Sequence, residues 1–342
     1  MNTAPLNAVI LAAGYGKRMH SSLPKVLHPI LGQPMIEHAL RAVSAVTAEK
    51  PVVVIGHGAD QVRAALGDRA RYALQSEQLG TAHALRMAES LLAADGGLVL
   101  LTTGDMPLLT GETLQELVDQ HHRHPGPITL LTVVMDDAHG FGRIVRGADG
   151  TVREIVEEAQ ATSEILAIKE LNASVYCFDS AWLWPALQQV QRSPKGEYYL
   201  TDLVGIAVQA GLPVQALVAA DYREALGVNT RVHLAEAAAV LQQRINQRWM
   251  TAGVSIVDPL NTYIEADVVL EAETTVYPGC LLRGKTVINS GCQIGPHAVI
   301  TDAQVGAHSV IEAAWIENCT LKENSRVTAY QRLNGDTLTP KL

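Results

Sequence analysis

The sequence has no long hydrophobic run, and it carries no broad basic surface. No apolar stretch in its 342 residues approaches the roughly 20 residues that a membrane-spanning helix needs, and the N-terminal segment lacks the layout of a signal peptide. The 35 acidic residues outnumber the 26 Lys and Arg, without a basic stripe of the kind that binds nucleic acid. We therefore expect a cytoplasmic protein that binds neither membranes nor nucleic acid.

Cysteine is also sparse. The four cysteines form no C-x-x-C pair, which argues against both a zinc motif and a disulfide framework. His121, His122 and His124 resemble a metal cluster only superficially, because they end an expected helix, where the dipole favours them and solvent can reach them. With 48% hydrophobic and 18% charged residues, the chain has the composition of an ordinary globular protein of about two domains.

Acidic residues are missing from the first 36 positions, although the whole chain carries a formal charge of −9. Within this stretch, an apolar run that suggests a buried strand ends in a glycine-bearing loop, which delivers Lys17, Arg18 and Lys25. In an open α/β sheet, such a loop at the carboxyl end of the first strand binds anions, since its backbone N–H groups can face phosphates. The loop is therefore expected to hold phosphate groups.

Two common phosphate-binding motifs do not fit this loop. The dinucleotide fingerprint requires a third glycine where Met19 stands, and the Walker motif requires Ser or Thr where Arg18 stands. The residues resemble instead the long Leu-Ala-Ala-Gly-x-Gly-x-Arg-Met…Pro-Lys motif of the sugar-1-phosphate nucleotidyltransferases. The matching residues are Leu11, Ala12, Ala13, Gly14, Gly16, Arg18, Met19 and the run Leu23-Pro-Lys-Val-Leu-His28.

Short apolar runs alternate with helical patterns over the first two-thirds of the chain. This alternation predicts right-handed βαβ units around a mainly parallel sheet, which is an α/β fold. The stretch 140–153 indicates an inserted β-hairpin with its turn at Asp149-Gly150, able to carry a second substrate. The expected strands are 8–13, 51–55, 98–102, 128–134 and 214–219, and the expected helices are 35–45, 59–66, 81–91 and 111–121.

The last third of the chain follows a six-residue period. Aliphatic residues recur every six positions from Ile264 to Ile300 and continue, after a one-residue slip, to Val327. A small or β-branched residue stands two places before each of them. Such hexapeptide repeats predict a parallel β-helix of about four coils, with aliphatic side chains inside and small ones, including three cysteines, at the corners.

These patterns divide the chain into four parts. The stretch 232–249 is rich in Ala, Gln and Arg without Gly or Pro, so it is expected to form a helix that links two domains. The predicted parts are a nucleotide-binding domain over 1–230, a linker helix over 231–252, the β-helix over 253–330 and a tail over 331–342.

Further motifs narrow the resemblance to the uridyltransferase half of the bifunctional N-acetylglucosamine-1-phosphate uridyltransferase/glucosamine-1-phosphate acetyltransferases. This resemblance spans nearly the whole chain, and its Gly-Glu-Tyr-Tyr-Leu-Thr-Asp block is the one most particular to the N-acetylglucosamine enzymes. It implies a Rossmann-like nucleotidyltransferase domain followed by a short left-handed β-helix of hexapeptide repeats, which assembles as a homotrimer in the family. The motifs are Gln75–His83, Thr103–Pro107, Gly140–Arg143, Ile155–Glu158, Glu170–Asn172, Gly196–Asp202 and Gly227–Arg231.

The reaction implied by this resemblance transfers a nucleotidyl group from UTP to a sugar 1-phosphate. An ionised phosphate oxygen attacks the α-phosphorus and pyrophosphate leaves, so catalysis needs alignment and charge neutralisation rather than a general base. Arg18 and Lys25 are the expected catalytic residues, since Arg grips a phosphate bidentately and Lys supplies a movable point charge. In the family, the residues corresponding to Asp105 and Asn229 hold Mg²⁺, a cation that prefers such oxygen donors.

The same resemblance assigns the substrate contacts. Gln75, Gly80 and Thr81 are expected at the uracil base. Polar side chains with a nearby glycine suit sugar hydroxyls and an acetamido group. The expected sugar contacts are Gly142, Glu157, Asn172 and Thr201, and Leu11, Ala12, Ala13, Gly14, Thr103 and Gly104 complete the expected substrate site.

The sequence departs from the family pattern at several positions. Lys17 stands where Thr is usual, Thr103 stands where Tyr is usual, and Ser174 replaces a glycine beside the expected sugar site. Another sugar phosphate or nucleotide, such as glucose 1-phosphate or dTTP, is therefore an open alternative, as is a non-catalytic regulator that binds sugar nucleotides. The Asn-Tyr-Asp-Gly segment of the family's acetyltransferase site does not occur here, so no acetyl transfer is expected.

Overall fold

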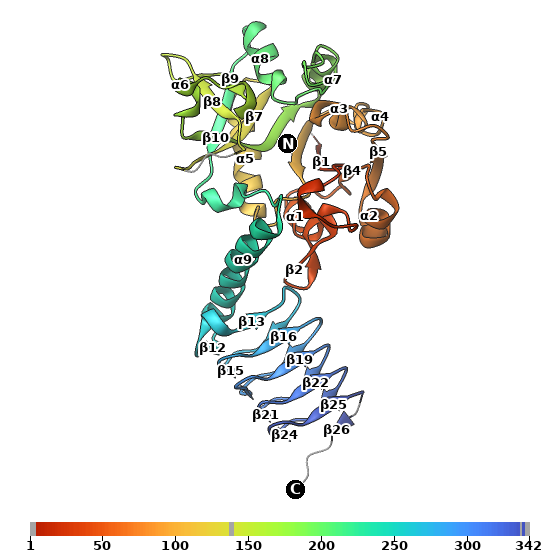
Figure 1. Ribbon diagram of the computed structural model, residues 1–342, viewed down its shortest axis with the longest axis vertical. Coiled ribbons are helices and arrows are strands. Elements are labelled where there is room, and N and C mark those ends of the chain that lie inside the picture. Colours follow the sequence, from red (N-terminus) through yellow and green to blue (C-terminus); the bar gives the residue numbers. More distant parts are fainter. Residues whose placement is uncertain (1–4, 137–139, 336, 339–342) are drawn as a thin grey trace. The chain divides into compact units, whose positions relative to one another are not determined.

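The structure is a computed structural model that describes residues 5–136, 140–335 and 337–338. The chain forms two compact units (Figure 1). Unit 1 comprises residues 1–28 and 34–234, and unit 2 comprises residues 29–33 and 235–342. The division falls inside the expected linker helix. It also assigns the short segment 29–33 to the second unit, whereas the sequence analysis placed this segment in the first domain.

Over the described residues, unit 1 is built on a nine-stranded sheet in which β11-β7-β10-β6-β1-β4-β5 lie side by side. Neighbouring strands pair in parallel except at β10, which runs antiparallel to β6, β7 and β8, and at the β8–β9 hairpin. The mainly parallel sheet and the inserted hairpin are thus confirmed. The strands are β1 (Leu6–Ala12), β4 (Val52–Ile55), β5 (Arg71–Leu74), β6 (Leu98–Thr103), β7 (Ile128–Val134), β8 (Arg143–Arg146), β9 (Val152–Val156), β10 (Glu170–Asp179) and β11 (Val214–Val218).

Helices cover both faces of this sheet, as Figure 1 shows. Alternate residues of β1 pack into two separate cores, because successive side chains of a strand point to opposite faces. Helices α1, α2 and α5 contribute to one core, and α3, α4, α7 and α8 contribute to the other. The helices are α1 (Met35–Ser44), α2 (Ala59–Leu66), α3 (Thr81–Arg86), α4 (Glu89–Leu92), α5 (Gly111–Arg123), α6 (Ser163–Leu166), α7 (Ser180–Leu187), α8 (Asp202–Gln209) and α9 (Arg231–Thr251).

Several details of unit 1 differ from the sequence analysis. The expected helix 81–91 is two helices, α3 and α4, and the sequence analysis assigned no element to β5, β10, α7 or α8. Within the part of the chain that the structure describes, no helix has the length and apolar character required to cross a membrane.

The histidines at the end of α5 do not share one environment. His122 is exposed and His124 is half-buried, but His121 is only 5% exposed. Its Nδ1 lies 2.9 Å from the hydroxyl oxygen of Thr129 on β7. Burial lowers the pKa of His121 to about 4. The expectation of a solvated side chain is therefore wrong for His121, because the last turn of α5 packs against the sheet.

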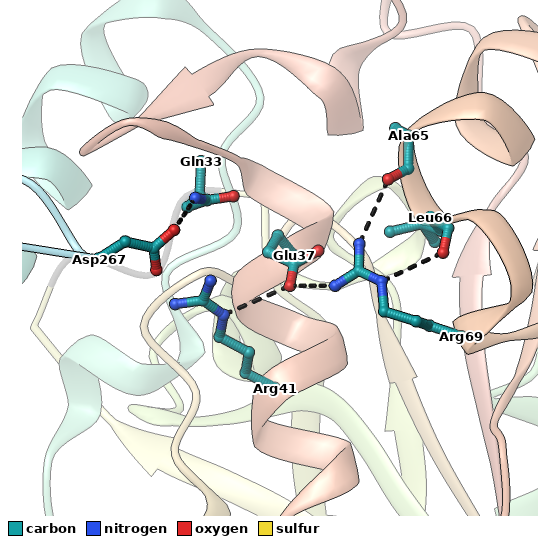
Figure 2. A network of polar contacts seen from close by, with 7 residues as sticks. All are labelled: Gln33, Glu37, Arg41, Ala65, Leu66, Arg69 and Asp267. Atoms are coloured by element: carbon teal, nitrogen blue, oxygen red, sulfur yellow. Dashed lines mark hydrogen bonds and ion pairs between the residues drawn. The ribbon is translucent and has the colours of Figure 1, made fainter. Parts of the chain in front are cut away.

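A buried carboxylate ties α1 to α2 (Figure 2). Glu37 in the first turn of α1 is 4% exposed and accepts hydrogen bonds from Arg69 at 2.6 Å and from Arg41 at 3.3 Å. Arg69 also donates to the carbonyl oxygens of Ala65 and Leu66, which a helix end leaves without partners. This network fixes α1, the helix that follows the loop 13–28, hereafter the phosphate loop.

As far as the structure describes unit 2, it consists of three parallel sheets of five short strands each, the arrangement of a short left-handed β-helix. Every aliphatic and small residue of the predicted hexads is buried, which confirms the six-residue repeat. The strands are β12 (Ser255–Ile256), β13 (Tyr263–Ile264), β14 (Val269–Leu270), β15 (Thr275–Val276), β16 (Leu281–Arg283), β17 (Val287–Ile288), β18 (Gln293–Ile294), β19 (Val299–Thr301), β20 (Gln304–Val305), β21 (Val310–Ile311), β22 (Trp315–Glu317), β23 (Thr320–Leu321), β24 (Arg326–Val327), β25 (Arg332–Asn334) and β26 (Thr337–Leu338).

The β-helix extends beyond its predicted C-terminal end at residue 330. One strand, β12, precedes the first expected aliphatic position, and β25 and β26 lie within the segment 331–342 that was expected to be a tail. Five strands per sheet give five coils in place of about four. The last two strands keep an aliphatic residue, Leu333 and Leu338, but Gln331 and Asp336 stand where the pattern has a small or β-branched residue, which is why the sequence analysis ended the repeat at Val327.

The segment 29–33 contacts the first coil of unit 2. The carbonyl oxygen of Leu31 accepts a hydrogen bond from Ala266 N at 3.0 Å, and the Gln33 amide donates to the carboxylate of Asp267 (Figure 2). The segment contains the short strand β2 (Pro29–Ile30) and the first residue of β3 (Gln33–Pro34). Its partners are more than two hundred residues away in the sequence, so no local pattern indicated the contact.

Candidate active site

A cavity of about 690 Å³ opens in unit 1 beside the carboxyl ends of β1 and β6. This is the edge at which open α/β sheets bind ligands. The phosphate loop, the segment 75–84, the end of β6 and the segment 197–201 contribute to its walls. The predicted site residues that line it are Leu11, Ala12, Ala13, Gly14, Lys25, Gln75, Gly80, Thr81, Thr103, Asp105, Glu157, Asn172 and Thr201.

Four predicted residues do not line the cavity: Arg18, Gly104, Gly142 and Asn229. Arg18 lies in the short 3-10 turn Lys17–Met19 and is exposed to solvent. Lys17 of the same turn does line the cavity. The sequence analysis named Lys17 as a cation of this loop but assigned the catalytic role to Arg18, whereas the structure places Lys17 and not Arg18 at the cavity.

The two glycines of this group join elements of the site. Gly104 N donates a hydrogen bond to the carbonyl oxygen of Leu11 at 2.9 Å, which connects the end of β6 to β1. The carbonyl oxygen of Gly142 accepts a hydrogen bond from Asn172 N at 2.9 Å. Gly142 is thus linked to the cavity through the backbone of Asn172, which lines it.

Lys25 lies between two side-chain oxygens that the sequence predicted as metal ligands. Its Nζ forms an ion pair with Asp105 Oδ2 and donates to Asn229 Oδ1 at 3.0 Å. Thr103 Oγ1 donates to the other carboxylate oxygen of Asp105 at 2.5 Å. Burial alone would raise the pKa of Asp105, but the charge of Lys25 and these hydrogen bonds outweigh it and lower the pKa. Asp105 is therefore an ionised carboxylate at neutral pH.

Backbone contacts bring these three side chains together. Val228 N donates to the carbonyl oxygen of Asp105 at 2.8 Å, which positions the following residue, Asn229. On the other side, Gly16 adopts a left-handed conformation with φ of 61°, and a Cβ at this position would lie 2.6 Å from Lys25 Cβ. The second glycine of the loop is thus required because Lys25 packs against its backbone.

The donor set fits a magnesium ion that is bound together with a phosphate. Asp105 and Asn229 offer two hard oxygens that already meet at one cation, the ammonium of Lys25. Mg²⁺ commonly takes one or two protein oxygens and completes its octahedron with water and substrate phosphates. Among the described residues, no group of three His, Cys, Asp or Glu side chains is arranged to hold a metal.

Gln75 lines one end of the cavity, where its amide has a fixed orientation. Its Nε2 lies 3.1 Å from the carbonyl oxygen of Gly80. Because a carbonyl can only accept, the atom facing it must be the amide nitrogen, which leaves Oε1 as the acceptor. Gln78, which the sequence analysis did not single out, lines the same end and donates to the carbonyl oxygen of Gln75 at 3.2 Å.

Thr81 and Gly80 are held by the segment that carries the Gly-Glu-Tyr-Tyr motif. The hydroxyl oxygen of Thr81 accepts a hydrogen bond from Leu200 N at 3.0 Å. Gly80 has φ of 103°, and a Cβ there would lie 2.5 Å from the carbonyl oxygen of Tyr198. Both residues therefore connect the Gln75 end of the cavity to the segment 197–201, in addition to lining the cavity.

Polar side chains cluster at the opposite end of the cavity. Thr201 Oγ1 donates to Glu157 Oε1 at 3.1 Å. Burial raises the pKa of Glu157, and the hydrogen bond from Thr201 opposes this shift without cancelling it. Asn172 Oδ1 accepts hydrogen bonds from Ser174 N at 3.1 Å and from the Tyr176 hydroxyl at 3.0 Å. Asn172, Ser174 and Tyr176 belong to β10, whereas Glu157 follows β9 and Thr201 precedes α8, so three separate elements assemble this end of the cavity.

Other lining residues were missed because no motif names them. Tyr15 and Lys17 line the mouth together, with the Lys17 ammonium 5.6 Å from the Tyr15 ring centroid. Their position in the cationic loop was the available signal. Ser174 and Tyr176 could be found only through their spacing from Asn172 on β10, a strand that the sequence analysis did not predict.

Comparison with known proteins bears on the family of this chain. Residues 8–204 match a family model described as the MobA-like NTP transferase domain. The bifunctional protein GlmU of Exiguobacterium sp. (strain ATCC BAA-1283 / AT1b) is 45% identical over 327 residues, which cover 95% of this chain and 72% of the relative.

Two further relatives match this chain to a similar extent. The bifunctional protein GlmU of Brevibacillus brevis is 45% identical over 95% of this chain and 71% of its own length. That of Geobacillus sp. (strain WCH70) is 46% identical over 91% and 69%. These matches favour an enzyme over a non-catalytic regulator. The chain belongs to the GlmU family and is a sugar-1-phosphate nucleotidyltransferase with a MobA-like NTP transferase domain followed by a short left-handed β-helix.

Proposed function

We propose that the protein transfers the uridylyl group of UTP to N-acetylglucosamine 1-phosphate in a Mg²⁺-dependent reaction that yields UDP-N-acetylglucosamine and pyrophosphate. The observation that carries this proposal is the cluster of Lys25, Asp105 and Asn229 beside a cavity lined at one end by Gln75 and at the other by Glu157 and Asn172. This arrangement offers separate places for a base, a phosphate chain and a sugar.

Selection of uracil follows from the amide of Gln75. Its Nε2 is committed to Gly80, so its Oε1 is left to accept a hydrogen bond. The N3–H of uracil can donate to that oxygen, whereas the N3 of cytosine carries no hydrogen. Thr81 and Gly80, fixed by the segment 198–200, border the same space.

The phosphates are held by charge. Lys17 and Lys25 line the cavity, and Arg18 lies in the same exposed turn as Lys17. Asp105 and Asn229 would hold Mg²⁺, which when bound neutralises charge on phosphate oxygens. The sugar phosphate is already ionised at neutral pH, so the protein needs only to align it and to stabilise the charge that develops during displacement.

The sugar binds at the end formed by Glu157, Asn172 and Thr201. Glu157 can accept hydrogen bonds from sugar hydroxyls, while Thr201 holds its carboxylate in place at 3.1 Å. Gly142 supports the position of Asn172 through its backbone. Carboxylate, amide and hydroxyl groups in one partly enclosed pocket suit a polyhydroxylated ring.

A cytoplasmic location is part of the proposal. The four cysteines are free and buried, as a reducing compartment permits.

The test is a pyrophosphate-release assay with Mg²⁺ across pairs of nucleoside triphosphates and sugar 1-phosphates. We expect the highest kcat/KM for UTP with N-acetylglucosamine 1-phosphate. Asp105→Asn is expected to lower Mg²⁺-dependent turnover by about 100-fold or more, whereas the control Asp60→Asn, outside the cavity, keeps it. Faster turnover of dTTP or glucose 1-phosphate would contradict the substrate assignment, and an active Asp105→Asn enzyme would contradict the metal assignment.

A further inference from the structure

Ser174 holds a backbone conformation that a serine rarely adopts. Its φ is 58°, in the left-handed region, although it stands in the middle of β10. For a residue with a Cβ this conformation is unfavourable, and such positions persist where the surrounding structure fixes them, often at functional sites. The register between β10 and β7 shifts between Asn172 and Tyr176, so Ser174 lies on a local bulge of the strand.

Ser174 lies on the cavity face of β10. Its neighbours Ala173 and Val175 are buried in the core, whereas Ser174 is exposed and lines the cavity with Asn172 and Tyr176. In the regular alternation of a strand, the residues on either side of one position share a face. Ala173 and Val175 pack into the same core, so this alternation is kept at Ser174, and its hydroxyl lies on the same face of β10 as Asn172 and Tyr176, at the sugar end of the site.

The same bulge determines which way the amide of Asn172 faces. Ser174 N donates to one amide atom of Asn172 at 3.1 Å. A backbone N–H can only donate, so this atom is Oδ1, and the Tyr176 hydroxyl at 3.0 Å must donate to it as well. Over the described residues, neither Asn172 Nδ2 nor the Ser174 hydroxyl has a hydrogen-bond partner within the protein. Two donors on one bulge thus remain for a ligand.

We propose that Ser174 is a specificity-determining residue for the acceptor sugar phosphate. Its hydroxyl and Asn172 Nδ2 together bind a carbonyl oxygen on the sugar, the group that a 2-acetamido substituent presents and a plain hydroxyl does not. A carbonyl oxygen has two lone pairs and accepts two such hydrogen bonds. The inference rests on the proposed function, since it assigns a contact to the acceptor of that reaction.

Two substitutions of Ser174 distinguish the effect of its hydroxyl group from the effect of its strained backbone conformation. Ser174→Ala removes the hydroxyl and keeps the left-handed residue with its Cβ, whereas Ser174→Gly removes both. We expect both variants to lower the ratio of kcat/KM for N-acetylglucosamine 1-phosphate over glucose 1-phosphate by about three- to tenfold, the value of one hydrogen bond. The KM for UTP should not change. Ser174→Gly should also melt about 2 °C higher than Ser174→Ala, since glycine adopts this φ freely.

The matched control is Glu273→Gly in unit 2. Glu273 is exposed and has φ of 63°, close to that of Ser174, but it does not line the cavity. Its replacement should raise the melting temperature without changing the sugar ratio. A structural role for Ser174 alone would alter stability and leave the ratio of the two sugar phosphates as it is.

Wild-type selectivity in Ser174→Ala overturns the inference. A second readout is independent of turnover: the thermal shift that N-acetylglucosamine 1-phosphate produces in the presence of UMP. A wild-type shift that both Ser174 variants lose supports the contact even if the proposed transfer reaction is not observed. Equal shifts in all three proteins, or no shift in the wild type, overturn it.

Discussion

Gly16→Ala tests whether the glycine of the phosphate loop positions Lys25, the lysine that we propose to be catalytic. The new Cβ would lie 2.6 Å from Lys25 Cβ, where ordinary contact is above 3.4 Å. Lys25 must therefore shift by roughly 1 Å, which disturbs the contacts of its Nζ with Asp105 and Asn229. A misplacement of about 1 Å in a catalytic group costs on the order of 100-fold in rate. We expect kcat to fall by about this factor.

Gly16→Ala should also lower the free energy of unfolding, by an amount that depends on backbone strain and not on the contact with Lys25. Gly16 has φ of 61°, so alanine there adds left-handed strain of about 1–2 kcal/mol. Gly211 has φ of 72°, and a Cβ at this position would meet no other atom within 4 Å. Gly211→Ala therefore carries the same strain without the contact to Lys25, which makes it the matched control.

The experiment measures kcat and the melting temperature of both variants and compares each with the wild type. Both should melt a few degrees below the wild type, about 2–4 °C per kcal/mol for a chain of this size class, but only Gly16→Ala should lose turnover. If Gly16→Ala keeps kcat within threefold of the wild type, the reasoning that this glycine positions Lys25 is refuted. A similar loss of kcat in Gly211→Ala would also refute it, since strain alone would then suffice.

Two further predictions concern pH and assembly. His121 has a pKa of about 4 in the folded protein, whereas in the unfolded chain its pKa is near 6.5. Between these two values the unfolded state binds a proton that the folded state does not. The free energy of unfolding is therefore expected to fall by about 2–3 kcal/mol as the pH is lowered from 7.5 to 4.5. In urea unfolding, His121→Gln should show a smaller loss over this range than the exposed control His122→Gln, and equal losses would contradict the assignment. We also propose that the β-helix forms a homotrimer through the outward side chains of β13, β16, β19 and β22, which include exposed Tyr263 and Trp315. Light scattering should then give three times 36.7 kDa, and Trp315→Glu should lower this mass; a monomeric wild type would count against the trimer.

Local periodicity accounts for the parts of the fold that the sequence predicted. The strand 128–134 and the helix 59–66 were predicted with the bounds that the structure gives them, since apolar run length and amphipathic spacing act within one element. The β-helix was predicted because each coil repeats the same packing. The antiparallel β10 was missed because its pairing partners, β6 and β7, are distant in sequence.

The sequence motifs predicted which residues carry the chemistry of the candidate site, but not how all of their side chains are placed. The motifs identified Lys25, Asp105 and Asn229, and the structure brings these three into contact. They did not indicate that Lys17 rather than Arg18 lines the cavity, because the direction of a side chain in a 3-10 turn depends on what packs around the loop. Nor did they show that Ser174 is held in a left-handed conformation.

The sequence by itself determined the chemistry available to this protein: a cationic loop after a first strand, a carboxylate at a later strand end and a repeat with a six-residue period. These are properties of neighbouring residues, and a few adjacent positions suffice to express them. The tertiary structure alone decided which groups meet. Asn229 reaches Lys25 across 204 positions, and the segment 29–33 joins the β-helix beyond residue 235, because such contacts depend on how strands and helices pack and not on any local pattern.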